Sequence, residues 1–484
     1  MAEKKSLKLN FIMNAILTMS SFLFPLISFP YVSRILLPEG TGKVSFATSL
    51  IAYFVMFAQL GIPTYGVRAC AKVRDDKRKL TKTAQELLII NLVMTAVSYA
   101  ALFLALIFVP RLRGERTLYL VVSLTIFVTT IGMEWLYKAL EQYTYIAVRS
   151  IAFKFVALVS MFLLVRSKED YVIYGGISIL ASSASFVMNF FHARKYIDLR
   201  PVGGYEFRPH LKAVMIFFFM SCASTIYTNM DTVMLGFMES DVTVGYYNAA
   251  VRIKNILVSI VTSLGTVLLP RAAYYVEHKL MDEFRTISRK ALNFVLVAAT
   301  PMMLYFILFA RDGIFLLSGS AYAGSILPMQ LAMPTLLFIG LSNILGIQIL
   351  VPMGKEIAVL WSIVVGAIVD VILNILLIPA YGAAGAAAAN MIAEGTVMLV
   401  QFIFLRKEVV PSMKKIQYWK IGLALLAGAA ASFWVAGLGF GSFVSLALSA
   451  VLFFGAYGLT LLALKERLTG EVLGQLPGKV LRRQ

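Results

Sequence analysis

The sequence predicts an all-α polytopic membrane protein. Of its 484 residues, 60% are hydrophobic and only 14% are charged, whereas a soluble domain is nearer half apolar and a quarter charged. About fourteen apolar segments are each long enough to cross a bilayer, which takes about 20 residues. A weak internal repeat with an offset of about 203 to 204 residues also indicates two homologous halves.

The expected membrane segments follow one another with short polar links. The N-terminal run is over 20 residues long and has no small-residue cleavage site, so it predicts a first membrane helix and not a signal peptide. Proline removes a backbone donor and bends helices, so bends are expected in the first, ninth and tenth segments, at Pro25, Pro30, Pro301, Pro328 and Pro334. The segments have these approximate limits: 10–33, 44–67, 86–109, 118–139, 147–166, 172–191, 213–237, 245–269, 291–311, 325–349, 357–379, 383–405, 418–437 and 442–464.

The repeat has an offset of about 203 to 204 residues. The stretch that begins at Gly42 is similar to the stretch that begins at Gly245, Leu60-Gly61 matches Leu264-Gly265, and Arg68 matches Arg271. A weak repeat of this length in a hydrophobic chain predicts a transporter built from two homologous halves. The last two segments lie outside it and are interpreted as an addition.

The distribution of positive charge predicts the orientation. With a cytoplasmic N-terminus, the inner links, the chain ends and the adjacent helix ends hold 34 of the 44 Lys and Arg residues, in agreement with the positive-inside rule. Both termini are therefore expected in the cytoplasm. This topology accounts for most of the net charge of +19, although a cavity for an anionic substrate would also favour basic residues.

The sequence argues against a metal site, a nucleotide site and a disulfide. The three histidines stand at no metal-ligand spacing, and the two cysteines lie in or beside membrane segments. Gly40-Thr41-Gly42-Lys43 is superficially like a phosphate-binding loop, but Leu37 replaces the first glycine and Val44 the hydroxyl residue. No cofactor is expected, apart from a coupling proton or sodium ion.

Charges within the membrane segments are functional candidates, because each costs roughly 2.5–3.5 kcal/mol on insertion scales. Asp231 and Arg252 are expected on adjacent helices, each roughly 10 Å below the same surface. Arg252 and Lys254 are candidate substrate-binding residues, and since they are two apart, at most one faces a cavity directly. The alternative is that one of them pairs with Asp231.

Two further basic residues on the outer side, Arg34 and Lys43, are candidate substrate-binding residues. The guanidinium of Arg34 would match pyrophosphate oxygens, and the alternative is that it only reaches the membrane interface. Asp370 and Asn374 share a helix face, and Glu394 lies near a helix midpoint, so these three could bind a coupling ion. Structural hydrogen bonding is the alternative for them.

A third group lies at the cytoplasmic end of the fourth segment. Glu134 and Lys138 are four residues apart, and Arg149 is near in sequence. Opposite charges at this spacing form ion pairs on one helix face. The group could be a cytoplasmic gate, or simply an interfacial cluster.

The order of these features resembles the multidrug/oligosaccharidyl-lipid/polysaccharide exporter superfamily and, within it, the bacterial Wzx-type polysaccharide-unit flippases. The resemblance covers nearly the whole chain. Its most specific stretches are Tyr65–Arg68 with Ala71–Asp76, Asn229–Gly236, Val244–Tyr247 with Ala249–Lys254, and Pro352–Lys355 with Gly366–Asp370.

The resemblance implies two six-helix lobes around a central cavity, with residues 1–200 as the N-lobe, 201–410 as the C-lobe and 411–484 as two further helices and a cytoplasmic tail. It also implies that the protein moves undecaprenyl-pyrophosphate-linked oligosaccharides to the outer leaflet of the bacterial cytoplasmic membrane by alternating access. The implied partners are the lipid-linked oligosaccharide, membrane lipids, and a polysaccharide polymerase and glycosyltransferases. Nucleic acid is not an expected partner, and a monomer is expected.

Three competing functions stay open. A lipid II flippase would be the same class of protein with another cargo. A multidrug–cation antiporter typically needs an acidic residue in the first helix or lobe, and 11–33 contains none. A membrane enzyme such as a polymerase or ligase usually has a long external loop with catalytic residues, and the outer links here are short.

Overall fold

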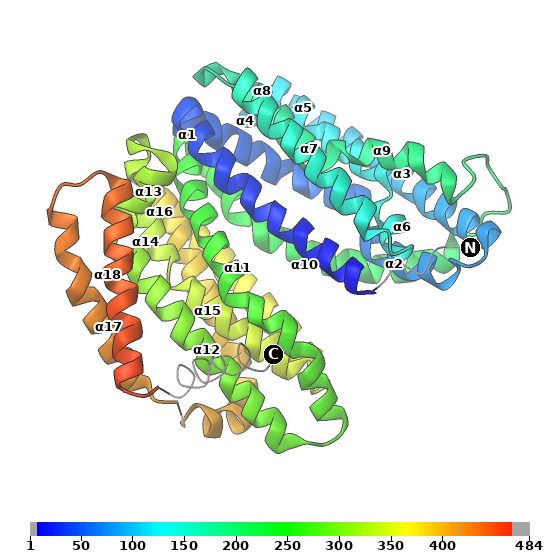
Figure 1. Cartoon of the computed structure of the whole chain (residues 1–484). Coiled ribbons are helices and arrows are strands. Elements are labelled where there is room, and N and C mark those ends of the chain that lie inside the picture. Colours follow the sequence, from blue (N-terminus) through cyan, green and yellow to red (C-terminus); the bar gives the residue numbers. More distant parts are fainter. Residues whose placement is uncertain (1–6, 415, 467–484) are drawn as a thin grey trace, which may run out of the picture. The chain divides into compact units, whose positions relative to one another are not determined.

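The computed structural model of the chain describes residues 7–414 and 416–466 (Figure 1). The described residues form helices and connecting segments, without strands. They fall into two compact units, 1–245 and 246–484. The predicted tail after residue 466 and the lysines before residue 7 lie outside the described residues, and the predicted lobe boundaries stay a prediction.

The helices of the first unit are α1 (Leu7–Gln59), α2 (Ile62–Lys72), α3 (Lys77–Phe108), α4 (Pro110–Arg113), α5 (Arg116–Gly132), α6 (Glu134–Ala139), α7 (Tyr143–Leu164), η1 (Lys168–Asp170), α8 (Tyr171–Ile179), η2 (Leu180–Ala184), α9 (Phe186–His192), η3 (Ala193–Lys195) and α10 (Arg208–Met238). α11 (Asp241–Glu277) begins in this unit and continues in the second.

The second unit also contains α12 (Met281–Leu308), α13 (Ala310–Ser318), η4 (Ser320–Ser325), α14 (Ile326–Ala332), α15 (Thr335–Asn343), η5 (Ile344–Leu350), α16 (Glu356–Met413), α17 (Tyr418–Ser432), η6 (Phe433–Gly437) and α18 (Ser442–Ala463).

In the described part of the chain, ten helices are long and apolar enough to cross a membrane, or up to twelve if each of two bent pairs counts as one span. The predicted number of fourteen is not confirmed. Two of the ten are 57 and 56 residues long and contain the non-helical residues Leu37 and Gly382. Both residues fall between segments that the sequence analysis separated. One bent pair has a 42° break beside Pro334, which agrees with the bend predicted there.

α1 organises the first unit. It consists of two helices that meet at Leu37, whose φ of 58° and ψ of 179° are non-helical. Figure 1 shows the blue chain turning back on itself there, and α1 lies against α3, α5, α7 and α10. α3 begins at a capped end, since the carboxylate of Asp76 accepts hydrogen bonds from the backbone N–H groups of Arg78 and Lys79.

Large apolar side chains face outward on many of these helices. Phe108, Phe155 and Phe219 are 65–70% exposed within the protein, whereas a soluble protein rarely exposes large apolar patches. A bilayer would cover it. Cys70 and Cys222 are free thiols.

The last two helices attach to the second unit by specific hydrogen bonds as well as by apolar contact. α17 and α18 lie beside each other and against α12 (Figure 1). The Tyr305 hydroxyl donates to the carbonyl of Leu446 at 2.8 Å, and the Tyr457 hydroxyl donates to the carbonyl of Val297 at 2.8 Å. The two added helices are therefore a fixed part of this unit.

Candidate functional site

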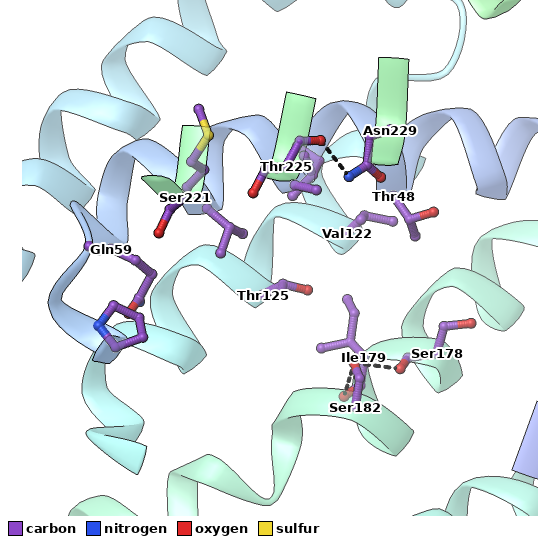
Figure 2. Close-up of a pocket in the computed structure, with 16 residues that line it drawn as sticks. Thr48, Gln59, Val122, Thr125, Ser178, Ile179, Ser182, Ser221, Thr225 and Asn229 are labelled. Atoms are coloured by element: carbon purple, nitrogen blue, oxygen red, sulfur yellow. Dashed lines mark hydrogen bonds between the residues drawn. The ribbon is translucent and has the colours of Figure 1, made fainter. Parts of the chain in front are cut away.

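The first unit contains a cavity of about 470 Å³ (Figure 2). Residues from α1, the α1–α2 junction, α5, the α8–η2 segment and α10 line it. Its polar lining residues are Thr48, Gln59, Thr125, Ser178, Ser182, Ser221, Thr225 and Asn229. We call this the hydroxyl-lined cavity, and a volume in this range is typical of a small-molecule site.

Gly61 lets α10 approach the cavity closely. Its φ of 73° is in the left-handed region, and a Cβ there would lie 2.4 Å from the backbone nitrogen of Phe218 on α10. Only glycine combines this conformation with this contact. Ser221, Thr225 and Asn229 follow Phe218 at helical spacing, so the same contact places them beside α1.

The wall near Gln59 is held by a buried network of amides and hydroxyls. The side-chain nitrogen of Gln59 donates to the hydroxyls of Thr129 and Thr130, at 3.3 Å each. The Thr130 hydroxyl is also 2.7 Å from that of Thr95. Asn91 donates to the carbonyls of Ala58 and Gln59 at 2.8 and 3.1 Å. These bonds fix the end of α1 at the cavity.

None of the predicted site residues is among the described residues that line this cavity. Arg34 is exposed and donates to the carbonyl of Pro30 on its own helix at 2.5 Å. Lys43 forms ion pairs with Glu39 at 3.1 Å and Glu115 at 2.9 Å, and it lies over the ring of Tyr171. The ammonium of Lys43 therefore already has two carboxylate partners, and its substrate role stays a prediction.

The structure brings the predicted gate residues together. Glu134 pairs with Lys138 at 2.8 Å and with Arg149 at 3.7 Å. The Arg149 side chain is only 2% exposed, and it also donates to the side-chain oxygen of Asn189. Its guanidinium lies over the ring of Phe186, 5.1 Å from the centroid. The cluster exists as predicted, and its role as a gate stays a prediction.

Asp231 and Arg252 lie in different compact units, so their predicted pairing stays a prediction. Asp231 is buried on α10, at 6% exposure. Lys254 is also buried and donates from Nζ to the side-chain oxygen of Asn390 on α16 at 3.0 Å. Arg252 is half-buried. Lys254 thus joins α11 to α16 within the second unit.

The two halves of α16 bring Asp370 and Glu394 to one level, with Asn374 one turn away. Gln401 donates to the hydroxyl of Ser362 at 3.0 Å, and a Cβ on Gly366 would lie 2.3 Å from Val397. The halves therefore run antiparallel. Counting from Gly366 in turns of four residues, Asp370 is level with residues 393–394 and Asn374 is level with residues 389–390. Asp370, Asn374 and Glu394 are all buried.

A close contact between repeat-related glycines was missed by the residue predictions. A Cβ on Gly42 would lie 1.8 Å from the carbonyl oxygen of Asp241, and one on Gly245 would lie 2.0 Å from that of Pro38. The repeat relates Gly42 to Gly245 and, by the same offset, Pro38 to Asp241. We call these four residues the glycine corner. The repeat was the signal that could have identified it.

Arg111 fastens the glycine corner. Its guanidinium is 2.5 Å from the carboxylate of Asp241 and donates to the carbonyl of Gly236 at 2.7 Å. It also lies over the ring of Phe46, 5.5 Å from the centroid. A residue from the α4 turn therefore holds the end of α10 and the start of α11 in place.

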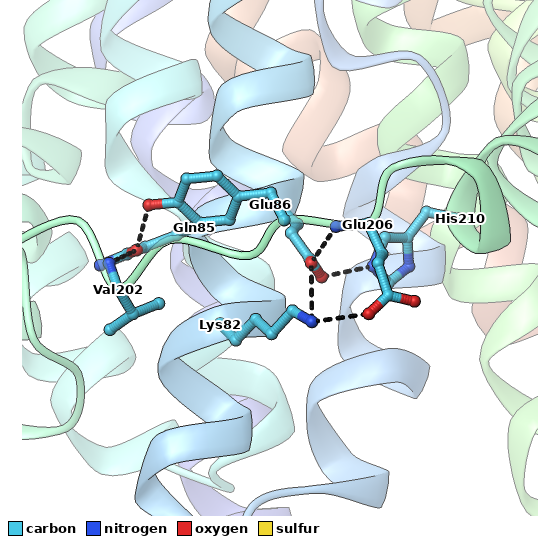
Figure 3. A network of polar contacts seen from close by, with 7 residues as sticks. Lys82, Gln85, Glu86, Val202, Glu206 and His210 are labelled. Atoms are coloured by element: carbon cyan, nitrogen blue, oxygen red, sulfur yellow. Dashed lines mark hydrogen bonds and ion pairs between the residues drawn. The ribbon is translucent and has the colours of Figure 1, made fainter.

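A second missed network holds the link before α10 (Figure 3). Glu86 is buried on α3 and accepts from His210 at 2.9 Å and from the backbone N–H of Glu206 at 2.7 Å. Lys82 donates to Glu206 at 2.9 Å, and this hydrogen bond lowers the pKa of the Glu206 carboxyl. Gln85 donates to two backbone carbonyls of the link, at 2.7 and 2.8 Å.

The chain has recognisable relatives. A profile of the family described as "Polysaccharide biosynthesis protein" matches residues 7–276, which is more than half of the chain. Two proteins named "Putative O-antigen transporter", from Escherichia coli strain K12 and Shigella dysenteriae, are each 23% identical to it. They align over 409 and 402 residues, which are 84% and 82% of this chain and 98% of each relative.

Two solved structures share the fold. A lipid II flippase, MurJ, in an inward closed conformation has a TM-score of 0.70 at 16% identity, covering 92% of this chain and 98% of that one. An inward-facing MATE family transporter of the MOP superfamily has a TM-score of 0.64 at 13% identity, covering 84% and 99%. The family match agrees with the predicted resemblance to polysaccharide-unit transporters, and the predicted all-α membrane fold is confirmed.

Proposed function

Because the chain belongs to the polysaccharide biosynthesis protein family, we propose that it is a flippase for lipid-linked oligosaccharide units. It would move an undecaprenyl-pyrophosphate-linked repeat unit from the inner to the outer leaflet of the bacterial cytoplasmic membrane. The names of the O-antigen transporter relatives and the MurJ-like fold support this. The observation that carries the proposal is the hydroxyl-lined cavity, which offers a polar compartment inside an apolar helical unit.

The mechanism follows from the cost of moving polar groups through lipid. A hydroxyl transferred from water to hydrocarbon without a hydrogen bond costs roughly 4–8 kcal/mol, so a free oligosaccharide headgroup does not cross a bilayer. A polar cavity replaces the lost water contacts while the polyprenyl tail stays in lipid. Alternating access would then expose the cavity to each side in turn. An inside-negative potential helps an anionic headgroup outward by about 2.3 kcal/mol per charge per 100 mV.

The two runner-up transport functions predict other cargo. A lipid II flippase is favoured by the similarity to MurJ, but at 16% identity that similarity concerns the fold. A multidrug–cation antiporter is favoured by the MATE-like fold. Against it, the described residues lining the hydroxyl-lined cavity include no carboxylate, and an organic cation would be buried there without a counter-charge.

We further propose that Asp370, Asn374 and Glu394 form the coupling site for a proton or sodium ion. Their burial within one turn of each other in α16 supports this, because ionisable groups buried in membrane helices mark ion pathways. The proposed protein crosses the membrane several times and has both termini in the cytoplasm. It acts as a monomer beside a polysaccharide polymerase and glycosyltransferases.

Depletion of the protein in its native host tests the function. If it is a flippase, the complete oligosaccharide accumulates on its lipid carrier at the inner leaflet, and mass spectrometry of extracted lipids detects it. Re-expression of the wild-type protein should clear the intermediate. If the carrier-linked unit never forms in depleted cells, the protein acts earlier in synthesis and the proposal is wrong. The sugars found also discriminate a polysaccharide unit from lipid II.

A further inference from the structure

Figure 2 shows the eight polar side chains of the hydroxyl-lined cavity. Five of them use their O–H or N–H groups for hydrogen bonds within the protein. The hydroxyls of Thr48, Ser178 and Ser182 each donate to a carbonyl one turn earlier, at 2.9, 2.9 and 2.8 Å. The amide nitrogen of Asn229 donates twice, at 3.0 and 3.1 Å, and that of Gln59 donates twice, at 3.3 Å. These five side chains therefore offer mainly oxygen lone pairs to a ligand.

The other three polar side chains of the cavity can serve as hydrogen-bond donors or as acceptors. A hydroxyl has one hydrogen and two lone pairs, so Thr125, Ser221 and Thr225 can each donate or accept. Their side-chain oxygens make no hydrogen bond within the described residues. The rest of the lining is apolar, including Ile51 and Val122. The lining is thus rich in acceptors, poor in donors and, among the described residues, free of charge.

This chemistry selects among ligand groups. A phosphate or carboxylate accepts hydrogen bonds only, so it would meet acceptors and lose its hydration without compensation. A cation would find acceptors but no carboxylate among the described lining residues. A neutral sugar supplies several O–H donors, and its oxygens can accept hydrogen bonds from the hydroxyls of Thr125, Ser221 and Thr225.

We propose that the hydroxyl-lined cavity binds an uncharged sugar residue of the cargo and that the pyrophosphate stays outside it. This inference rests on the proposed function and specifies which part of the cargo the first unit recognises. Gln59 and Asn229 act as acceptors for sugar hydroxyls, and Thr129 and Thr130 are positioning residues that orient the Gln59 amide. A sugar bearing a carboxylate is excluded from the cavity.

Protection of a cavity cysteine tests the proposal. The full-length protein, with Cys70→Ala, Cys222→Ala and Ala52→Cys, is placed in lipid nanodiscs and labelled with a small maleimide. Ala52 lines the cavity and bears no polar group. The probes are farnesyl-pyrophosphate-linked N,N′-diacetylchitobiose, farnesyl pyrophosphate alone, the corresponding disaccharide with a terminal uronic acid, and tetraphenylphosphonium. Only the neutral disaccharide probe should slow labelling.

A matched pair of variants separates recognition from general damage. Thr48→Val removes a cavity acceptor and should weaken protection by the neutral probe about 3- to 10-fold in half-maximal concentration, the effect of one hydrogen bond. Thr396→Val makes the same change at a hydroxyl that likewise donates to the preceding turn, at 2.8 Å, but lies on α16 in the second unit. It should leave protection unchanged.

Each outcome decides something. Equal protection by farnesyl pyrophosphate, by the uronic-acid probe or by tetraphenylphosphonium overturns the proposal, as does an equal loss in Thr48→Val and Thr396→Val. Flipping of a fluorescent neutral probe in proteoliposomes is measured in parallel. If the protein flips the probe but Ala52→Cys is not protected, this inference is wrong and the proposed function stands. Protection without flipping supports the sugar site and contradicts the proposed function.

Discussion

Replacing Gly42 with alanine should destabilise the first unit, because the glycine corner has no room for a Cβ. In the structure that Cβ would lie 1.8 Å from the carbonyl oxygen of Asp241 and 2.9 Å from the nitrogen of Gly245. Real Cβ atoms essentially never come within 3.0 Å of another residue. Both neighbours belong to the backbone, which no side-chain rotation can move, so the start of α11 must shift away from α1.

The expected size of the effect comes from overpacking, which typically costs 1–3 kcal/mol. For a unit of this size, each kcal/mol shifts the melting temperature by roughly 2–4 °C, so Gly42→Ala should melt roughly 2–12 °C below its control. The control is Gly458→Ala on α18, where no atom lies within 4 Å of the added Cβ. At a helix position without contacts, alanine should be neutral or stabilising by up to about 1 kcal/mol.

Melting is measured on purified protein in detergent with a thiol-reactive dye, since Cys70 is buried and reacts when the first unit unfolds. Gly245→Ala should behave like Gly42→Ala, because its Cβ would meet the carbonyl oxygen of Pro38 at 2.0 Å. If Gly42→Ala melts at or above the temperature of Gly458→Ala, the close contact does not exist in the protein and the reasoning fails.

Three more predictions concern topology and charge. In a cysteine-free background, a membrane-impermeant maleimide on intact cells should label Ser240→Cys and spare Lys77→Cys, and the reverse pattern would overturn the orientation. Arg149→Met should lower the amount of folded protein measured by fluorescence-detected size exclusion, because it removes the buried cation of the cluster. Lys138→Met removes the more exposed partner of Glu134 and should cost at most about 1 kcal/mol of stability. Equal losses of folded protein in the two variants would contradict this. Arg252→Ala should fold normally but lose transport, with little recovery in Arg252→Lys, and full transport by the alanine variant would remove Arg252 from the substrate path.

Local spacing explains which parts of the candidate site were predictable. Glu134 and Lys138 are one helical turn apart, and the structure pairs them. The same rule shows why Lys43 was a weak substrate candidate, because Glu39 is also one turn away and pairs with it. Glu115, the second partner of Lys43, is distant in sequence and could not be foreseen.

The cavity itself could not be read from the sequence. Thr48, Thr125, Ser182 and Thr225 come from four separate segments, and single hydroxyls in membrane helices usually bond to their own backbone. Which of them face a common space depends on how the helices pack, and that depends on contacts such as Gly61 against Phe218. The predicted site residues were chosen mainly because they are charged, whereas the described residues that line this cavity are uncharged.

The hydrogen bonds of the link before α10 would hold the protein together even if the link were cut. Gly203 and Gly204 have φ values of 70° and 63°, with no atom within 4 Å of an added Cβ. Gln85 holds the chain before them through the carbonyls of Asp198 and Arg200, and Glu86 holds the chain after them. A protease that nicked this exposed loop would leave both new ends bound to α3, so the two fragments would stay together as a non-covalent complex.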